Sequence, residues 1–176
     1  MKPVFILLTG LSGSGKTTLG KGLTTYYSNL GKRVCHLDGD DIRKVIHRNL
    51  GFTKEDRRKQ LMLTVELSLT YLKKGINVII SLITSYNSHR LDAKEFIENK
   101  GYNFILVYVD CPIEVCIKRD PKELYKKVLK GEIKNFTGID DPYESPKMMD
   151  LHLPTETMNY EDSLQKMINY KFIKTT

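Results

Sequence analysis

One nine-residue stretch limits most strongly what this chain can fold into: Gly10-Leu11-Ser12-Gly13-Ser14-Gly15-Lys16-Thr17-Thr18. It fits the pattern G-x-x-x-x-G-K-[ST], the phosphate-binding P-loop. An apolar run over residues 4–9 precedes it, as expected of a buried strand, and a helical pattern follows over 17–30. The motif needs a strand before it and a helix after it, so a chance glycine-rich turn is the poorer interpretation.

Each part of this loop has an expected task. The glycines allow backbone N–H groups to turn inward around a phosphate, and the helix N-terminus adds partial positive charge. Lys16 is expected to reach the β- and γ-phosphates, and the Thr17 hydroxyl to bind Mg²⁺. We therefore predict a nucleoside triphosphate site made by Gly10, Ser12, Gly13, Ser14, Gly15, Lys16, Thr17 and Thr18.

The composition is that of an ordinary globular domain. The chain has 176 residues, 40% hydrophobic and 28% charged, which suits a single domain over residues 1–176. We expect no signal peptide and no membrane segment, because the N-terminus leads straight into the first strand and no apolar run is long enough. Three cysteines without metal-ligand spacing predict buried free thiols in a reducing cytoplasm: Cys35, Cys111 and Cys116.

The net charge of +7 fits either nucleic acid or small anionic substrates, and the distribution of the basic residues leads us to favour small anionic substrates. The basic residues cluster at 57–59 and 118–134 and form no uninterrupted block, and no recognition helix or aromatic RNA-binding strand stands out. An RNA-binding protein and a nucleotide-dependent switch are the rival classes. A GTPase switch would need an Asn-Lys-x-Asp stretch to read guanine, and the sequence contains none.

Strand and helix patterns alternate along the chain. Further strands are predicted at 33–37, 76–83, 103–109 and 151–153, and further helices at 41–49, 54–74, 88–100 and 161–170. Thr53, with Asp56 three residues later, marks a helix start. The repeated β-then-α order predicts an α/β fold of the P-loop NTPase, nucleotide-kinase-like type, with three layers and a mostly parallel five-stranded sheet.

Ligands of such sheets bind beyond the carboxyl ends of the strands. That rule brings the P-loop and residues 38–41, 84–86 and 110–119 to one mouth. The stretch from about 121 to 146 interrupts the alternation, because it is basic, then acidic, and punctuated by glycine and proline. We expect it to form a mobile lid over the site.

Two aspartates, Asp38 and Asp40, flank Gly39 where the second predicted strand meets a helix. A carboxylate there can order water on Mg²⁺ or accept the proton of an attacking hydroxyl. A helix cap is the structural alternative, but two aspartates around Gly39 at this place favour the functional role. Asp38 is the better candidate for a structural role. We therefore choose Asp40 as the base and Lys16 as the second catalytic residue.

Arginines and one aromatic residue follow. Arg43 lies three residues after Asp40, and Arg57 and Gln60 share a helix face at i and i+3. The arginines either bind an anionic acceptor as a fork or are solvated surface charge. Phe52 is either a core plug or a plate on which a base stacks, and the pattern favours neither.

Arg119, after the fourth strand, is expected to cross the donor phosphates or to lie against the donor base. For lid lysines such as Lys126, a solvated face is the alternative to a role in catalysis. The histidines have no ligand spacing, so we assign no metal or catalytic role to His36, His47, His89 and His152.

Several of these stretches resemble the adenylylsulfate (APS) kinase family. They are the P-loop, Leu37-Asp38-Gly39-Asp40-Asp41-Ile42-Arg43, Leu50-Gly51-Phe52 with Asp56-Arg57, and a long lid match ending in Phe136-Thr137-Gly138-Ile139-Asp140-Asp141-Pro142-Tyr143-Glu144. The resemblance covers nearly the whole chain. It implies an enzyme, often a homodimer, that uses Mg²⁺ and moves the γ-phosphate of ATP to the ribose 3′-hydroxyl of adenosine 5′-phosphosulfate.

The resemblance also implies roles for individual residues. Asp40 would lie near the attacking hydroxyl, and Arg43 and Arg57 would bind the 5′ anionic tail of the acceptor. Phe52 and Phe136 would sandwich its base, which turns the interpretation of Phe52 towards stacking. Lys126 would lie in the lid near the acceptor, and Arg119 would border the donor nucleotide.

The chain departs from the family pattern mainly on the acceptor side. Gln60 stands where the family has Asn, and Met62 and Leu63 replace two arginines. After the third strand, Ile83-Thr84-Ser85-Tyr86 replaces the usual Ile-Ser-Pro-Tyr. With these departures, the predicted acceptor-binding residues are Asp38, Arg43, Phe52, Arg57, Gln60, Ile83, Thr84, Ser85, Lys126 and Phe136.

An unchanged donor side beside a changed acceptor side favours the same reaction on a different 5′-substituted nucleotide. A divergent branch of the family phosphorylates cytidine diphosphoramidate in capsular phosphoramidate biosynthesis. That acceptor also has a compact anionic 5′ tail and a free 3′-hydroxyl, so the hypothesis favours it. The alternative is an adenylylsulfate kinase that makes 3′-phosphoadenylylsulfate in sulfate assimilation.

Overall fold

A computed structural model of the protein describes residues 2–45, 50–170 and 172. Five parallel strands form one sheet in the order β2-β3-β1-β4-β5. Its central strand is β1 (Val4–Thr9), between β3 (Asn77–Ser81) and β4 (Asn103–Asp110), with β2 (Val34–Asp38) and β5 (Leu151–Pro154) at the edges. The predicted strand number is confirmed, and the sheet is parallel throughout the described strands.

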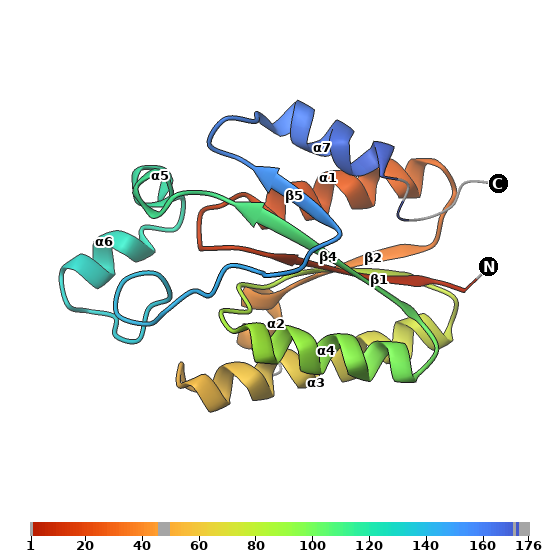
Figure 1. The fold of residues 1–176 in the computed structure, drawn as a ribbon, viewed down its shortest axis with the longest axis horizontal. Helices are drawn as coiled ribbons and strands as arrows, with labels where there is room; N and C mark the ends of the chain where they lie inside the picture. The colour runs from red at the N-terminus through yellow and green to blue at the C-terminus, as the bar shows by residue number, and fades with distance from the viewer. Residues whose placement is uncertain (1, 46–49, 171, 173–176) are drawn as a thin grey trace.

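Helices cover both faces of this sheet (Figure 1). One face carries α1 (Lys16–Asn29) and α7 (Tyr160–Asn169); the other carries α3 (Lys54–Lys73), α4 (Asn87–Asn99) and the short α2 (Gly39–Val45). The predicted three-layer α/β arrangement is therefore confirmed.

The residues of β1 divide the core into two halves. Ile6 and Leu8 join the apolar cluster with α1 and α7, whereas Phe5 and Leu7 join the cluster with α3 and α4. Successive side chains of a strand point to opposite faces, so a strand covered on both sides needs a continuous apolar run. All six residues of β1 are buried, and the loop that follows starts from a rigid position.

Two short helices lie beyond the carboxyl ends of the strands (Figure 1): α5 (Ile113–Arg119) and α6 (Leu124–Leu129). The sequence did not predict them, because helices of seven and six residues are too short to show a 3.6-residue period. α6 and a turn in which Thr137 bridges to Asp141 lie inside the segment predicted as a lid, residues 121–146.

Other predicted boundaries need small corrections. The helix expected at 41–49 begins at Gly39, and its last residues, 46–49, lie outside the described part of the chain. The third strand ends at Ser81, two residues before its predicted end, and Thr84 adopts φ +47° in the loop that follows. The predicted helix start is confirmed: the Thr53 hydroxyl accepts a hydrogen bond from the Asp56 amide (3.1 Å). Within the described ranges, no helix combines the length and the apolar character that a bilayer crossing needs.

Candidate active site

The P-loop joins β1 to α1 through glycines that other residues replace badly. Gly10, Gly13 and Gly15 have φ of 151°, 77° and 104°. A Cβ on Gly10 would lie 2.2 Å from the Val109 carbonyl oxygen of the neighbouring strand. The loop can therefore run close to β4 only if residue 10 has no side chain.

Gly10→Ala is expected to destabilise the protein by on the order of 3 kcal/mol, because the new methyl group overlaps backbone that cannot move aside. For a chain of this size that lowers the melting temperature by roughly 10 °C, which calorimetry measures. Gly31→Ala is the matched control, since Gly31 also has positive φ (70°) but no atom within 4 Å of its Cβ position. Equal shifts in the two variants would contradict the steric argument.

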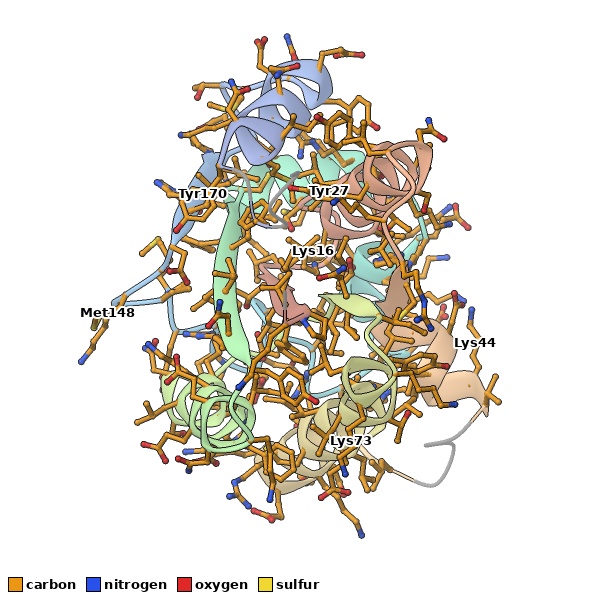
Figure 2. The ribbon with its side chains drawn as sticks, turned by 90° about the vertical axis from the view of Figure 1, so that its right-hand side faces the viewer. Lys16, Tyr27, Lys44, Lys73, Met148 and Tyr170 are labelled. Carbon is orange, nitrogen blue, oxygen red and sulfur yellow. The ribbon has the colours of Figure 1, made fainter. Side chains whose placement is uncertain are left out.

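Lys16 is folded inward at the start of α1. It is 8% exposed, and its Nζ donates to the Leu11 carbonyl (2.6 Å) and lies 3.5 Å from Ser14 Oγ. Figure 2 shows Lys16 near the middle of the molecule. Burial lowers the pKa of Lys16 to about 8, although the charges of Asp40 and Asp38 work in the opposite direction.

Thr17 and Asp38 form an oxygen cluster beside Lys16. The Thr17 hydroxyl donates a hydrogen bond to Asp38 Oδ2 (2.5 Å), and Asp38 Oδ1 accepts one from the Asp40 backbone amide (2.9 Å). A hydroxyl and a carboxylate are ligands that Mg²⁺ accepts when phosphates and water complete its shell. No group of three or more His, Cys, Asp or Glu residues in the described chain could hold a metal. Thr17 and Asp38 thus fit a Mg²⁺ ion carried by a nucleotide.

Asp40 is paired with a residue of the predicted lid. Its carboxylate forms an ion pair with Lys122, and both side chains are about half exposed. Partial burial opposes the shift, but the hydrogen bond and charge of Asp40 raise the pKa of Lys122. The predicted base is thus held by a cation from the turn between α5 and α6.

Arg43 and Arg57 surround Phe52. The Arg43 guanidinium lies over the Phe52 ring, 4.4 Å from its centroid, and Arg57 lies 5.7 Å from the same centroid. Arg57 Nε donates to the Phe52 carbonyl (2.9 Å), and its Nη2 donates to the carbonyl of Asn135 (2.5 Å). Burial lowers the pKa of both arginines. Arg57 thus connects Phe52 to the residue before Phe136.

Phe52 and Phe136 differ in their surroundings. Phe52 is 46% exposed, whereas Phe136 packs edge-on against Tyr125 of α6 with ring centroids 5.0 Å apart. The Tyr125 hydroxyl donates to the Ser12 carbonyl (2.9 Å), which ties the lid segment to the P-loop. Arg57 also forms an ion pair with Asp141 (3.5 Å). The lid segment therefore contacts both the P-loop and Arg57.

Ile83, Thr84 and Ser85 connect elements within the protein. The Thr9 hydroxyl donates to the Ile83 carbonyl (2.6 Å) and accepts from the Thr84 hydroxyl (2.6 Å). Ser85 Oγ lies 3.0 Å from Thr137 Oγ1 in the lid segment. Thr84 and Ser85 are 8% and 1% exposed, so their hydroxyls face protein groups in this arrangement.

Arg119 lies on the β5 side of the P-loop. Its Nη2 donates to the Thr155 carbonyl (2.5 Å), and the Thr155 hydroxyl donates to the Ser14 carbonyl (3.0 Å).

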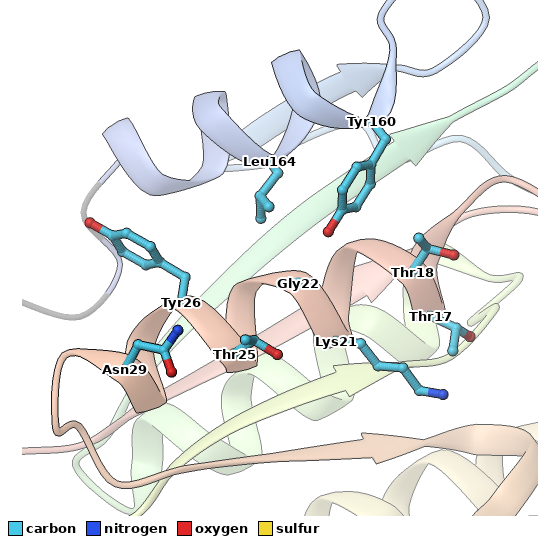
Figure 3. A pocket seen from close by; sticks show the side chains of 9 residues that line it. All are labelled: Thr17, Thr18, Lys21, Gly22, Thr25, Tyr26, Asn29, Tyr160 and Leu164. Carbon is cyan, nitrogen blue, oxygen red and sulfur yellow. The ribbon is translucent and has the colours of Figure 1, made fainter.

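Lys126 lies apart from the other predicted residues: it pairs with Glu123 (3.1 Å) on an exposed lid face. Thr18 lines a groove of about 560 Å³ between α1 and α7 that begins at Thr17 (Figure 3).

Two residues of this arrangement were missed by the sequence reasoning. Lys122 lies within the matched lid stretch, but its partner Asp40 is 82 positions away and no local pattern connects them. Thr155 follows the fifth strand, and the rule that ligands bind beyond strand ends could have identified it.

Comparisons with known proteins now decide the family. The family model described as adenylylsulphate kinase matches residues 2–154. The chain belongs to the adenylylsulphate kinase family. It is 40% identical to the adenylyl-sulfate kinase of Clostridium kluyveri over 167 residues, covering 95% of this chain and 82% of the relative. It is 41% identical to a probable adenylyl-sulfate kinase of Pseudomonas aeruginosa, covering 94% and 76%.

The fold agrees with this family assignment. The APS kinase of Mycobacterium tuberculosis, solved in complex with AMPPNP and APS, superposes with a TM-score of 0.92 at 33% identity, covering 96% of this kinase and 97% of that chain. This kinase is therefore a phosphotransferase of the APS kinase family with the family's fold.

Proposed function

We propose that this kinase transfers the γ-phosphate of ATP to the ribose 3′-hydroxyl of adenosine 5′-phosphosulfate. The main support is the position of Asp40: it follows β2, close enough to Lys16 for its charge to act on the lysine's pKa, and α2 carries it together with Arg43. A base placed between a phosphate loop and an aromatic plate is suited to direct a hydroxyl at a γ-phosphate.

The residues divide the reaction between them. The P-loop amides and Lys16 hold the donor phosphates, and Thr17 and Asp38 would hold Mg²⁺, which neutralises phosphate charge when bound. Asp40 accepts the proton of the 3′-hydroxyl as its oxygen bonds to the γ-phosphorus and the bond to the bridging oxygen breaks, releasing ADP. Arg57 binds the acceptor's anionic tail, and Phe52 stacks on its base. The lid segment excludes water.

Cytidine diphosphoramidate is the second candidate acceptor. The observation that favours it is Gln60, whose longer side chain replaces the family's Asn and contacts Arg43. The relatives named above are adenylyl-sulfate kinases, which supports adenosine 5′-phosphosulfate over the cytidine compound. For the same reason, sulfate assimilation is the better supported setting than capsule synthesis.

An acceptor screen tests the proposal. Purified enzyme is given ATP and Mg²⁺ with adenosine 5′-phosphosulfate, with cytidine diphosphoramidate, or with neither, and ADP release is followed. We expect turnover with adenosine 5′-phosphosulfate. Turnover with the cytidine compound alone would establish the second candidate, and ADP release that needs no acceptor would refute both.

Arg57→Ala is expected to raise the KM for the acceptor by roughly 10- to 100-fold, the usual effect of losing a charge-assisted hydrogen bond, and to leave the KM for ATP nearly unchanged. Steady-state kinetics with each substrate varied in turn measures both. Arg58→Ala is the matched control, because Arg58 pairs with Asp92 (2.6 Å) away from the site. A change in the KM for ATP alone would contradict the place given to Arg57.

The family resemblance also leads us to propose a homodimer, which light scattering of the eluting protein would measure. The three free cysteines fit a reducing compartment such as the cytoplasm.

A further inference from the structure

Gln60 uses both ends of its side-chain amide inside the protein. It lies on α3, is 5% exposed, and donates from Nε2 to the Gly39 carbonyl (3.2 Å). Its Oε1 accepts a hydrogen bond from Arg43 Nη2. Gly39 and Arg43 are both residues of α2, so one side chain of α3 fixes both the start of α2 and the guanidinium that α2 carries.

Arg43 passes this constraint on to the loop before α3. Its Nη1 donates to the carbonyls of Leu50 (2.8 Å) and Gly51 (3.1 Å), while its guanidinium lies over the Phe52 ring. With three hydrogen bonds and a stacked ring, the guanidinium is held by the protein. The chain of contacts therefore runs from Gln60 through Arg43 to Phe52.

We propose that Gln60 is a positioning residue for acceptor binding: it holds Arg43, and Arg43 holds Phe52 at the angle at which the acceptor base stacks. This inference rests on the proposed function, which takes Phe52 as the stacking plate. A direct contact between Gln60 and the acceptor is the poorer explanation, because its side chain is buried and both ends of the amide already have partners.

Side-chain length explains why this residue differs from the family's Asn. An Asn amide would end short by about one carbon–carbon bond, roughly 1.5 Å, and could not reach both Gly39 and Arg43. Loss of the Arg43 contact would free the guanidinium to turn and the Phe52 ring to follow it. The longer residue thus ties the plate to α3 in a way that the shorter one cannot.

Three variants separate the two ends of the amide. Gln60→Met keeps the approximate length and removes both hydrogen bonds, and Gln60→Asn keeps the amide but shortens the reach. Gln60→Glu keeps an acceptor for Arg43 and loses only the donor to Gly39. We expect Gln60→Met and Gln60→Asn to raise the KM for adenosine 5′-phosphosulfate about tenfold at a nearly constant KM for ATP, and Gln60→Glu to stay within about threefold of wild type.

A second measurement does not depend on turnover. The chain has no tryptophan, so Phe52→Trp introduces one fluorophore at the plate. Time-resolved anisotropy of the ligand-free protein should show a more mobile indole when Gln60→Met is added, and an unchanged one when Gln60→Glu is added. The inference would be overturned if the indole were equally mobile in Phe52→Trp alone and in both double variants. It would also be overturned if Gln60→Met and Gln60→Glu increased the indole's mobility by the same amount. If the wild type ignores adenosine 5′-phosphosulfate, the proposed function fails, and the anisotropy still decides the positioning role.

Discussion

Asp40→Asn is expected to lower kcat by about a thousandfold while ATP binds within about threefold of wild type. Removal of a positioned general base costs roughly 10²- to 10⁴-fold in rate, and the amide keeps the shape while losing the ability to take a proton. Rapid-quench measurement of ADP formation gives kcat, and calorimetric titration with ATP gives the affinity.

Asp41→Asn is the control for this substitution. Asp41 is the next residue of α2, and its carboxylate pairs with Lys44 on an exposed face (3.3 Å). We expect it to leave kcat within about twofold, as for other surface charges. Equal kcat values for the two variants would show that position 40 contributes only charge, and unchanged turnover with Asp40→Asn would remove it from the mechanism.

Lys16→Ala is expected to lower kcat/KM for ATP by about a thousandfold, because a buried cation aimed at a developing phosphate charge is difficult to replace. The Lys16 side chain is directed into the loop by the Leu11 carbonyl, so no neighbouring lysine takes its place there. Lys21→Ala is the control, since Lys21 lies five residues further along α1. Similar losses in both would contradict a specific role for Lys16.

The pH dependence of ATP binding follows from the same residue. Burial lowers the pKa of Lys16 from 10.5 to about 8, so the free enzyme loses this charge as the pH rises through 8. Phosphate binding favours the charged form. The Kd for ATP should therefore rise above pH 8 by up to about tenfold per pH unit, and be nearly flat just below it. Titration calorimetry between pH 7 and 9.5 checks this. If the Kd for ATP of Lys16→Ala does not change with pH, the pH dependence of the wild type is due to Lys16.

The strand–loop–helix arrangement around the P-loop could be predicted from the sequence because its determinants are local. Strand, glycine loop and helix follow one another within residues 4–29, and Asp38 and Asp40 follow the next strand. The parallel direction of the strands followed from similar local reasoning, since each β-then-α unit has a preferred parallel return. Their order in the sheet was not predicted, because it depends on tertiary packing.

The acceptor side could be predicted only as a list of residues. The partners of Arg57, Asp40 and Ser85 lie 78, 82 and 52 positions away, in a lid segment without periodic pattern. Hydrogen bonds between such distant side chains depend on tertiary packing, which no local pattern contains. For the same reason, the two hydrogen bonds of the Gln60 side chain could not be predicted. The sequence showed that Gln60 departs from the family pattern, but not what the residue contacts.

Phosphorus NMR of the product tests the central claim, transfer to the 3′-hydroxyl, most directly. Enzyme, ATP, Mg²⁺ and adenosine 5′-phosphosulfate are incubated until ADP accumulates, and proton–phosphorus coupling then locates the new phosphate. The account predicts one new phosphomonoester coupled to the ribose H3′, in an amount equal to the ADP formed. Inorganic phosphate in place of that signal, or a new phosphate on the 5′ chain, would contradict it.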